Sequence, residues 1–364
     1  MTYLEDKGVR NLETNVKRLR KQVFTEVANV AYNSENINDD IEAIPYKITP
    51  GDTPQYCESI YRERAITRER IRLAMGLSLR PEDKPVHLTQ GVDEKYYEPP
   101  LMQVIPAACN ACEHNVYEVS NQCKGCVAHP CMEVCPVHAI RMENGKSVID
   151  KNLCIKCGKC KANCPYDAIS HKRRPCADAC GANAIGSDEL GRAAIDEKKC
   201  VSCGMCMVNC PFGAIADKSQ IFQLIRALRS GKEIYVALAP AFVGQFGEYA
   251  TPDKIKAALL KLGFKGVYEV AMGADMGCIE EAEHYVKEVA TGEVPFLLTS
   301  CCPSWAMLSK KHFPETIDKI SNALTPMVAT ARMIKKEHPK ACVVFIGPCA
   351  AKKLEAMRRT IRSD

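Results

Sequence analysis

Four copies of one short signature constrain this 364-residue chain more than any other feature. Each copy begins with a cysteine, ends in Ala-Ile and closes a run of cysteines. The copies are CPVHAI at Cys135, CPYDAI at Cys164, CGANAI at Cys180 and CPFGAI at Cys210. Cysteine runs of this kind hold cubane iron-sulfur clusters in bacterial ferredoxins. The sequence therefore predicts a protein that transfers electrons.

Two complete runs have the spacing C-x2-C-x2-C-x3-C-P, and a run upstream has the variant C-x2-C-x4-C-x3-C-P. In the ferredoxin pattern three close thiolates bind one cluster, and the fourth cysteine reaches the neighbouring cluster. The runs are therefore expected to work in pairs. Pairing the first two runs predicts a 4Fe-4S cluster on each of two cysteine sets. Set 1 is Cys123, Cys126, Cys131 and Cys164, and set 2 is Cys135, Cys154, Cys157 and Cys160.

An internal duplication extends this assignment, because residues 135–169 align with residues 180–215 along nearly their whole length. The second copy lacks the C-x2-C pair that should precede Cys176, while Cys109 and Cys112 form a spare pair upstream. Two more clusters are expected on this basis. Set 3 is Cys180, Cys200, Cys203 and Cys206, and set 4 is Cys109, Cys112, Cys176 and Cys210.

Disulfides and structural zinc are the alternatives to clusters. A disulfide scaffold suits a secreted chain, but the first residues are rich in charge and do not resemble a signal peptide. Zinc usually binds two C-x2-C pairs, without the C-P endings and third thiolates seen here. For Cys109 and Cys112 a zinc site or a redox thiol pair stays open.

The charge and hydropathy pattern limits the kinds of partner that this chain is expected to bind. The net charge is +5, and the basic residues are spread out and not interleaved with aromatic residues, so no nucleic-acid partner is expected. No apolar run is long enough to span a membrane, and abundant free thiols favour a reducing compartment, which predicts a cytoplasmic protein. The basic run at 172–174 could meet an acidic electron carrier, although a solvated loop is the simpler interpretation.

The chain divides into four expected regions. They are a helical region at 1–80, a proline-rich linker at 81–105, a duplicated ferredoxin-like domain with four 4Fe-4S clusters at 106–217, and an α/β domain at 218–364. In the helical region, 11–33 and 59–77 carry apolar residues at three-to-four spacing. The lone Cys57 is expected to be a small buried residue.

The α/β region alternates apolar strands with helices, which predicts a mostly parallel sheet covered on both faces. Strands are expected at 233–241, 266–271, 296–300 and 342–347. Helices are expected at 252–263 and 278–290 and from Ser304 and Pro326 onward. Cys278 and Cys342 are expected in the core.

Two of these strands end in cysteine motifs, TSCCPSW and GPCAAKKLE. Together with ALAPA and GADMGCIEEA, the motifs resemble the iron-only (FeFe) hydrogenases, whose catalytic domain follows ferredoxin-like clusters in this order. The resemblance covers about residues 100–364. The multi-cluster front and the pair Pro326-Met327 resemble a non-prototypical, group B-like branch of that family.

The resemblance implies a ferredoxin-linked hydrogenase that reversibly reduces protons to H2 at an H-cluster, which joins a 4Fe-4S cube to a two-iron subsite. Cys302 and Cys349 match two of the four cysteines that hold the cube. Lys352 matches the lysine that contacts a cyanide ligand of the subsite. The implied partners are ferredoxin or a similar electron carrier, and the maturation proteins that build the subsite.

A proton relay is implied by the same resemblance. Cys301 matches the relay thiol, Glu281 the next carboxylate and Ser321 the hydroxyl beside it. The second relay glutamate falls on His284, and histidine can still carry a proton at neutral pH.

Other positions depart from the family pattern. Ala241 stands where the better-known enzymes often have serine, and Gly347 where they have methionine. The A-C-x-G-G-C segment that would supply the remaining cube ligands is absent from these 364 residues. The sequence is therefore expected to be a gene fragment without hydrogen turnover of its own. The alternatives are a sensory or regulatory H-cluster protein and a non-catalytic iron-sulfur electron-transfer or assembly protein.

Overall fold

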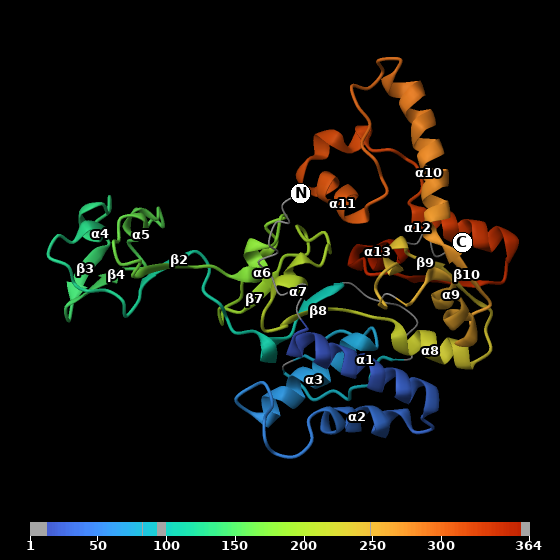
Figure 1. The fold of residues 1–364 in the computed structure, drawn as a ribbon, viewed down its shortest axis with the longest axis horizontal. Helices are drawn as coiled ribbons and strands as arrows, with labels where there is room; N and C mark the ends of the chain where they lie inside the picture. The colour runs from blue at the N-terminus through green and yellow to red at the C-terminus, as the bar shows by residue number, and fades with distance from the viewer. Residues whose placement is uncertain (1–12, 82, 93–99, 248, 358–364) are drawn as a thin grey trace.

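The computed structural model describes residues 13–81, 83–92, 100–247 and 249–357. Parts of the expected helical region and linker, at 1–12, 82 and 93–99, lie outside the described residues, as does the chain end at 358–364. In the described part, no helix has the length and apolar character needed to cross a membrane. Figure 1 shows a helical body, two cluster-binding units and an α/β body.

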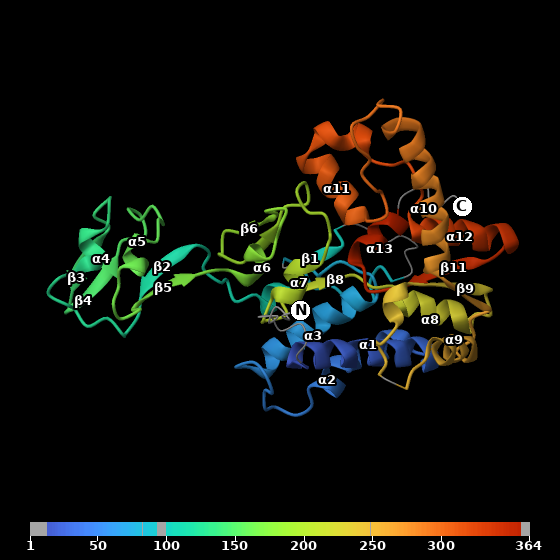
Figure 2. The same ribbon diagram turned by 45° about the horizontal axis from the view of Figure 1, so that its top comes forward.

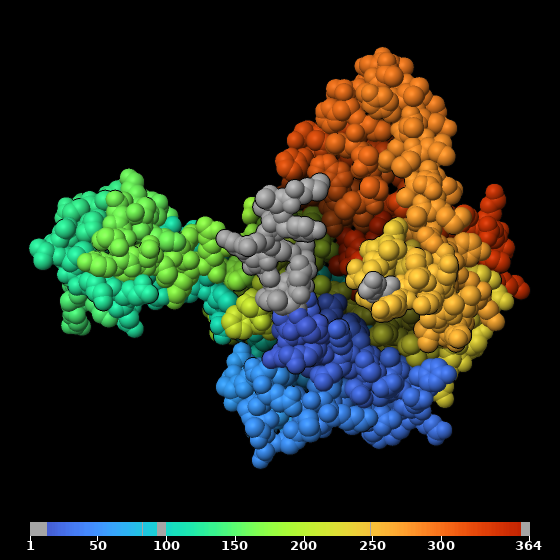
Figure 3. Space-filling view, viewed as in Figure 1, coloured from blue at the N-terminus to red at the C-terminus, as the bar shows by residue number. Residues whose placement is uncertain are grey.

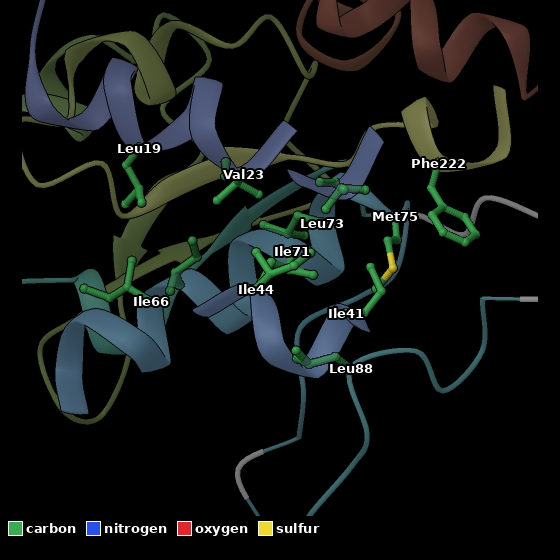
Figure 4. Packing of buried hydrophobic residues seen from close by; sticks show 14 of the residues in the cluster. Leu19, Val23, Ile41, Ile44, Ile66, Ile71, Leu73, Met75, Leu88 and Phe222 are labelled. Atoms are coloured by element: carbon green, nitrogen blue, oxygen red, sulfur yellow. The ribbon is translucent and has the colours of Figure 1, made fainter. Parts of the chain in front are cut away.

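The N-terminal body contains the helices α1 (Asn15–Asn33), α2 (Ile37–Ile48) and α3 (Ile60–Ala74). The helices expected near 11–33 and 59–77 are confirmed as α1 and α3. Thr14 caps α1 by accepting a hydrogen bond from the Lys17 amide. Apolar side chains of the three helices pack together, and Phe222 of the α/β body joins them (Figure 4). The N-terminal body is therefore anchored to the rest of the chain by a continuous apolar core.

The first cluster unit, residues 116–172, is a small body with two antiparallel strand pairs. It contains β2 (Val116–Val119), α4 (Pro130–Glu133), β3 (Ile140–Glu143), β4 (Lys146–Ile149), α5 (Lys159–Ala162) and β5 (Ile169–Lys172). Strand β2 pairs with β5, and β3 pairs with β4. These elements pack mainly on one another, and the unit extends to one side of the molecule (Figures 1 and 3).

The second cluster unit, residues 101–112 and 174–217, repeats this plan but is interrupted by the first. It contains β1 (Met102–Val104), η1 (Pro106–Ala108), α6 (Pro175–Asp178), β6 (Ile185–Ser187), β7 (Ala193–Ile195), α7 (Met205–Asn209) and β8 (Ile215–Asp217). Strand β1 pairs antiparallel with β8, and β6 pairs with β7. The first unit is thus inserted into a loop of the second, and β1 begins within the expected linker at 81–105.

The α/β body has a three-stranded parallel sheet in the order β10-β9-β11. Its strands are β9 (Ile234–Leu238), β10 (Gly266–Glu269) and β11 (Cys342–Ile346). Its helical segments are α8 (Ile221–Arg229), η2 (Pro240–Phe242), α9 (Pro252–Lys261), α10 (Val270–His284), η3 (Tyr285–Val289), α11 (Pro303–His312), η4 (Pro314–Lys319), α12 (Pro326–Glu337) and α13 (Ala350–Ala356). Residues on both faces of β9 are buried, which explains its continuous apolar sequence. The expected mixed α/β class is confirmed.

Asp217 forms ion pairs that link the helical body, the second cluster unit and the α/β body. Its carboxylate, at the end of β8, pairs with Arg20 of α1 at 2.7 Å and with Lys353 of α13 at 2.5 Å. Burial by itself would raise the pKa of Asp217, but the charges of Lys353 and Arg20 hold the pKa below its ordinary value. The carboxylate is therefore ionised where the helical body, the second cluster unit and the α/β body meet.

Three expectations for the α/β body are wrong. Residues 296–300 form no strand, because Leu298 makes only one isolated bridge, to Ile320, away from the three-stranded sheet. Cys278 is exposed, since α10 buries only residues near its start and then extends away from the sheet (Figure 2). Cys342 is exposed at the beginning of β11. Cys57, by contrast, packs half-buried against the N-terminal core.

Candidate iron-sulfur and catalytic site

Two cavities in the first cluster unit are lined by cysteines. Set 1 lines a cavity with about 330 Å³ of empty volume, and set 2 lines another with about 320 Å³. In each cavity three cysteines come from one run and the fourth comes from the other. This exchange follows from the antiparallel β2–β5 pair, which carries the end of the second run back beside the first.

The second cluster unit repeats the arrangement. Set 4 lines a cavity with about 320 Å³ of empty volume, although its members are spread over 102 residues, from Cys109 to Cys210. In set 3 burial, together with the nearby Cys200, Cys203 and Cys180, raises the pKa of the Cys206 thiol to about 12. A raised pKa makes the free thiolate unfavourable. Binding to a metal offsets this, because coordination deprotonates the thiol directly.

The repeated Ala-Ile ending has a structural cause. The Ala139 amide donates to Cys135 Sγ at 3.3 Å, and the alanine of each other copy makes the same hydrogen bond to its cysteine. The residue before each alanine adopts a left-handed backbone, which turns the amide toward the sulfur. These residues are His138, Asp167, Asn183 and Gly213, with φ between 47° and 59°. Polar residues and glycine tolerate this conformation best.

The spare pair, Cys109 and Cys112, has the same turn geometry as the other C-x2-C pairs. Ala111 has a φ of 45°, in the same left-handed region as Gly125, Lys156 and Ser202, which precede the second cysteine of the other pairs. The Ala193 amide donates to Cys109 Sγ at 3.4 Å, just as the Ser147 amide donates to Cys123 Sγ at 3.5 Å. Cys109 thus takes the place in the second unit that Cys123 takes in the first.

The cavities suit a cube of iron and sulfide better than a single ion. Among the described residues, no group of three or more histidine, cysteine, aspartate or glutamate side chains converges closely enough to hold one metal ion. Zinc draws its four ligands to about 2.3 Å from one point, whereas the four thiols of sets 1, 2 and 4 each surround an open volume. Amide donation to ligand sulfur is also a feature that tunes iron-sulfur clusters.

Sequence reasoning misjudged the basic run at 172–174. Lys172 forms ion pairs with Glu113 and Glu118, and Arg174 is only 4% exposed. Arg174 lines the cavity of set 4 and donates to the carbonyls of Cys112, Gly186 and Gly191 at 2.7–2.9 Å. The run is therefore mainly structural, and its one deeply buried guanidinium faces a cysteine cavity.

The cysteines of set 3 lie against the α/β body. The Ser304 hydroxyl donates to the Val201 carbonyl at 3.2 Å, and Lys311 Nζ donates to the Cys200 carbonyl at 2.6 Å. A Cβ on Gly204 would lie 3.8 Å from the Cβ of Ala350, at the start of α13. Set 3 therefore contacts both helices that begin at the hydrogenase-like cysteine motifs.

Those two motifs meet at the ends of α11 and α13. Cys302 precedes α11, and Cys349 precedes α13 directly after β11. Lys352 Nζ donates to the Cys301 carbonyl at 3.2 Å and pairs with Glu355 at 2.9 Å, so it ties the two motifs together. Cys302 is exposed and Cys349 is half-buried. The arrangement gathers two thiols and one cation at the carboxyl end of the sheet, where ligands bind in α/β folds.

Hydrogen bonds begin at Ser300, the residue that precedes Cys301. The Ser300 amide donates to Glu281 Oε1 at 3.1 Å, and its hydroxyl donates to the carbonyl of Ala323 at 2.7 Å. The Ala323 amide donates to Ser321 Oγ at 3.1 Å, and Ser321 Oγ lies 3.3 Å from His284 Nδ1. Ser300 thus connects the segment at Cys301 with Glu281 and, through Ala323 and Ser321, with His284, which lies one turn from Glu281 on α10. The Cys301 thiol itself contacts Thr299 Oγ1 at 4.0 Å. Sequence reasoning missed Ser300, although it directly precedes the Cys-Cys pair.

Ala241 and Gly347, two of the departures from the family pattern, follow the carboxyl ends of β9 and β11. Ala241 belongs to η2, just after β9, and presents a methyl group. Gly347 follows β11, and a Cβ added there would come within 2.6 Å of the Phe345 ring and 2.8 Å of Ala239. Any side chain at 347 requires a shift of these neighbours, so glycine fits the observed packing.

Comparison with known proteins identifies the parts of the chain. Residues 232–364 match the family described as "Iron only hydrogenase large subunit, C-terminal domain", and residues 153–214 match a "4Fe-4S dicluster domain". Residues 123–173 match the LdpA Fe-S cluster-binding domain. The first cluster unit and the α/β body are thus matched by separate families.

Named relatives agree with these matches. Iron hydrogenase 1 of Clostridium pasteurianum is 30% identical over 239 residues, covering 61% of this chain and 41% of the relative. The NADP-reducing hydrogenase subunit HndD of Solidesulfovibrio fructosivorans is 29% identical over 38% of this chain and 27% of the relative. The cytosolic Fe-S cluster assembly factor NAR1 of Meyerozyma guilliermondii is 27% identical over 37% of this chain and 29% of the relative.

The alignments span less than half the length of each of these relatives. Within that span, 4Fe-4S cluster-binding domains are followed by the hydrogenase domain, as the motifs imply. The chain therefore contains an iron-only hydrogenase C-terminal domain, preceded by 4Fe-4S cluster-binding domains.

Proposed function

We propose that the chain carries electrons through four 4Fe-4S clusters to an H-cluster, for the reversible reduction of protons to H2. The contact between set 3 and the helices α11 and α13 is the observation that carries this proposal. It supports an electron path that ends beside Cys302 and Cys349. Electrons would enter from ferredoxin or a similar carrier, in the cytoplasm, and dedicated maturation proteins would supply the two-iron subsite.

When bound, the H-cluster supplies the redox chemistry that forms and cleaves the H–H bond. The Cys302 and Cys349 thiolates would hold its cube from one side, as two of its four protein ligands. The Lys352 ammonium would balance negative charge there, because it is 11% exposed and already directed at Cys301. Cys301 would hold a proton at its thiol beside the subsite.

Protons would leave Cys301 toward Glu281, Ser321 and His284. Glu281 is held by the Ser300 amide, and Ser321 lies within hydrogen-bond distance of His284. The histidine imidazole can both accept and release a proton at neutral pH, so it can serve where the better-known enzymes use a carboxylate. The placement of Glu281 and His284 one turn apart on α10 supports a proton path along this helix.

Cluster content tests the first half of the proposal. The anaerobically reconstituted chain is expected to bind about 16 irons and about 16 sulfides, since four cubes hold four of each. Replacing both Cys109 and Cys112 by serine is expected to remove one quarter of the iron and to leave the other clusters spectroscopically intact. Loss of zinc instead of iron in this variant would overturn the assignment of set 4.

Hydrogen evolution tests the second half. In the native protein, matured with the two-iron subsite, Cys301→Ser is expected to lower H2 evolution about 100-fold, a usual cost of removing a proton-transfer group. Cys342→Ser, at an exposed cysteine outside the hydrogen-bond chain, is the matched control and should keep full activity. Equal activity in the two variants would contradict the relay.

A second function is favoured by specific residues. The relatives include an Fe-S cluster assembly factor, and this chain has Ala241, Gly347 and His284 at departures from the family pattern. A protein that only assembles clusters should transfer iron and sulfide to an apo-ferredoxin and evolve no H2 after maturation.

A sensory member of the family should bind the H-cluster but reduce protons only slowly. The infrared bands of the carbon monoxide and cyanide ligands would show that the H-cluster is bound.

A further inference from the structure

The two cluster units expose equivalent faces to different surroundings. Val201 in the second unit corresponds to Ile155 in the first, since each follows the first cysteine of its run. Val201 is 6% exposed and packs near Met307 and Leu308 of α11, whereas Ile155 is 59% exposed. The face through which the second unit meets its neighbour is therefore uncovered in the first unit, which extends away from the other bodies (Figure 3).

The side chains on this face differ in charge between the units. Positions occupied by Ser202, Met205 and Met207 in the second unit are occupied by lysines in the first. The lysines surround two exposed apolar residues, Leu153 at 55% and Ile155 at 59%. We call this surface the lysine face; it consists of Leu153, Ile155, Lys156, Lys159 and Lys161.

The charges of the lysine face are available to a partner. All three lysines are exposed, and no acidic residue occurs from Lys151 to Tyr166. Within the described residues, no carboxylate forms an ion pair with any of the three, in contrast to Lys172, which is paired twice. Cys157 of set 2 is exposed between them, so a cluster bound there would lie close to the surface.

We infer that the lysine face docks a small acidic electron-carrier protein that delivers electrons to the cluster of set 2. An apolar centre with a charged rim is the usual composition of a transient protein interface, and cations on the rim steer an acidic partner into place. In each transfer the reduced carrier loses one electron and the cluster gains it, with no bond formed or broken. The inference rests on the proposed electron-transfer function of set 2.

The test uses the reconstituted holo-protein and a purified, acidic two-cluster bacterial ferredoxin in its reduced form. The variant K156E/K159E/K161E reverses the charge of the face, and K254E/K261E/K265E makes the same charge change on and beside α9. Stopped-flow absorbance gives the second-order rate of cluster reduction over a range of salt concentrations. Reduction by dithionite and the iron content establish that each variant still holds its clusters.

We expect the wild type and the α9 variant to react with ferredoxin at rates that fall as salt rises. The lysine-face variant should react at least about 10-fold more slowly at low salt, and its rate should no longer fall with salt. Wild-type rates and salt dependence in that variant would overturn the inference. Salt-dependent self-association that the variant loses, with ferredoxin rates unchanged, would overturn it in favour of a second copy of the chain.

The controls distinguish failure of the proposed electron-transfer function from failure of the docking inference. If set 2 holds no cluster, or if its cluster is not reduced by dithionite, the proposed electron-transfer function fails. If the cluster is reduced by dithionite in every protein but ferredoxin does not distinguish the variants, only the docking inference fails.

Discussion

Arg174 distinguishes set 4 from the other cysteine sets. Of the three cysteine-lined cavities described, only that of set 4 has an arginine in its lining. Burial and, to a smaller extent, Cys210 raise the pKa of the Cys176 thiol to about 11, although Arg174 opposes this increase. A buried cation that lowers the free energy of a thiolate also lowers that of a reduced, more negative cluster. The cluster of set 4 should therefore be easier to reduce because of Arg174.

Replacing Arg174 by glutamine should lower the reduction potential of the set 4 cluster. We expect a change on the order of 60 mV, which is about 1.4 kcal/mol for a one-electron couple. Potentiometric titration followed by electron paramagnetic resonance measures it. Arg173→Gln, at the exposed neighbouring position, is the control and should have little effect. An unchanged potential in the Arg174 variant, with iron content intact, would show that the guanidinium only supports the loops.

The left-handed turns before each Ala-Ile pair give these short segments their shape. Asp167 has a φ of 47°, and the following amide donates to Cys164 Sγ at 3.4 Å. A β-branched residue in this conformation is strained by roughly 1–2 kcal/mol, whereas glycine is not. The turn and the hydrogen bond to sulfur thus depend on each other.

Asp167→Val should loosen the set 1 cluster, while Asp167→Gly should retain it. The valine variant is expected to lose roughly 1–2 kcal/mol of stability and to release iron faster to a chelator. Anaerobic thermal unfolding and the rate of bleaching of the cluster absorbance measure the two effects. Ser170→Val, at an exposed position on β5, provides a matched control with extended backbone. Equal iron release from the two valine variants would contradict the explanation.

Sequence reasoning succeeded where structure is local and failed where it depends on distant partners. Cysteine spacing predicts which thiols line the cavities of sets 1 and 2, because three cysteines of each set lie close together in sequence. The burial of Arg174 could not be predicted, since the carbonyls that hold it include that of Cys112, 62 residues earlier. The apolar segment at 296–300 resembles a strand, but a strand also needs a neighbour, and only Ile320 pairs with it.

Asp217 holds the helical body, the second cluster unit and the α/β body together. Its side chain is 6% exposed and contacts Arg20 and Lys353, from the two ends of the described chain. Lys353 adjoins Lys352 in α13, so this ion pair also positions the helix that follows Cys349. Removing one partner of a buried ionic group is costly, because the remaining charges lose their compensation.

Asp217→Asn should destabilise the native protein by about 3–5 kcal/mol and loosen α13. Hydrogen exchange of α13 amides and thermal unfolding measure this, with Glu143→Gln, in an exposed pair with Arg141, as the control. Acid should act similarly in the wild type. The folded-state pKa is below the ordinary 3.8, so the stabilisation is complete above that pH and is lost as the pH falls below it. An α13 that exchanges at the control rate would contradict this role.

The insertion of one cluster unit within another has a consequence for how such proteins diversify. The ends of the inserted unit lie together, since Arg174 Nε donates to the Cys112 carbonyl at 2.8 Å. A loop whose ends already touch can accept a further folded copy without disturbing its host. Gene segments that encode such copies can therefore be gained or lost while the junction with the hydrogenase domain is preserved. In the proposed electron path, the number of clusters can thus change in evolution separately from the site at its end.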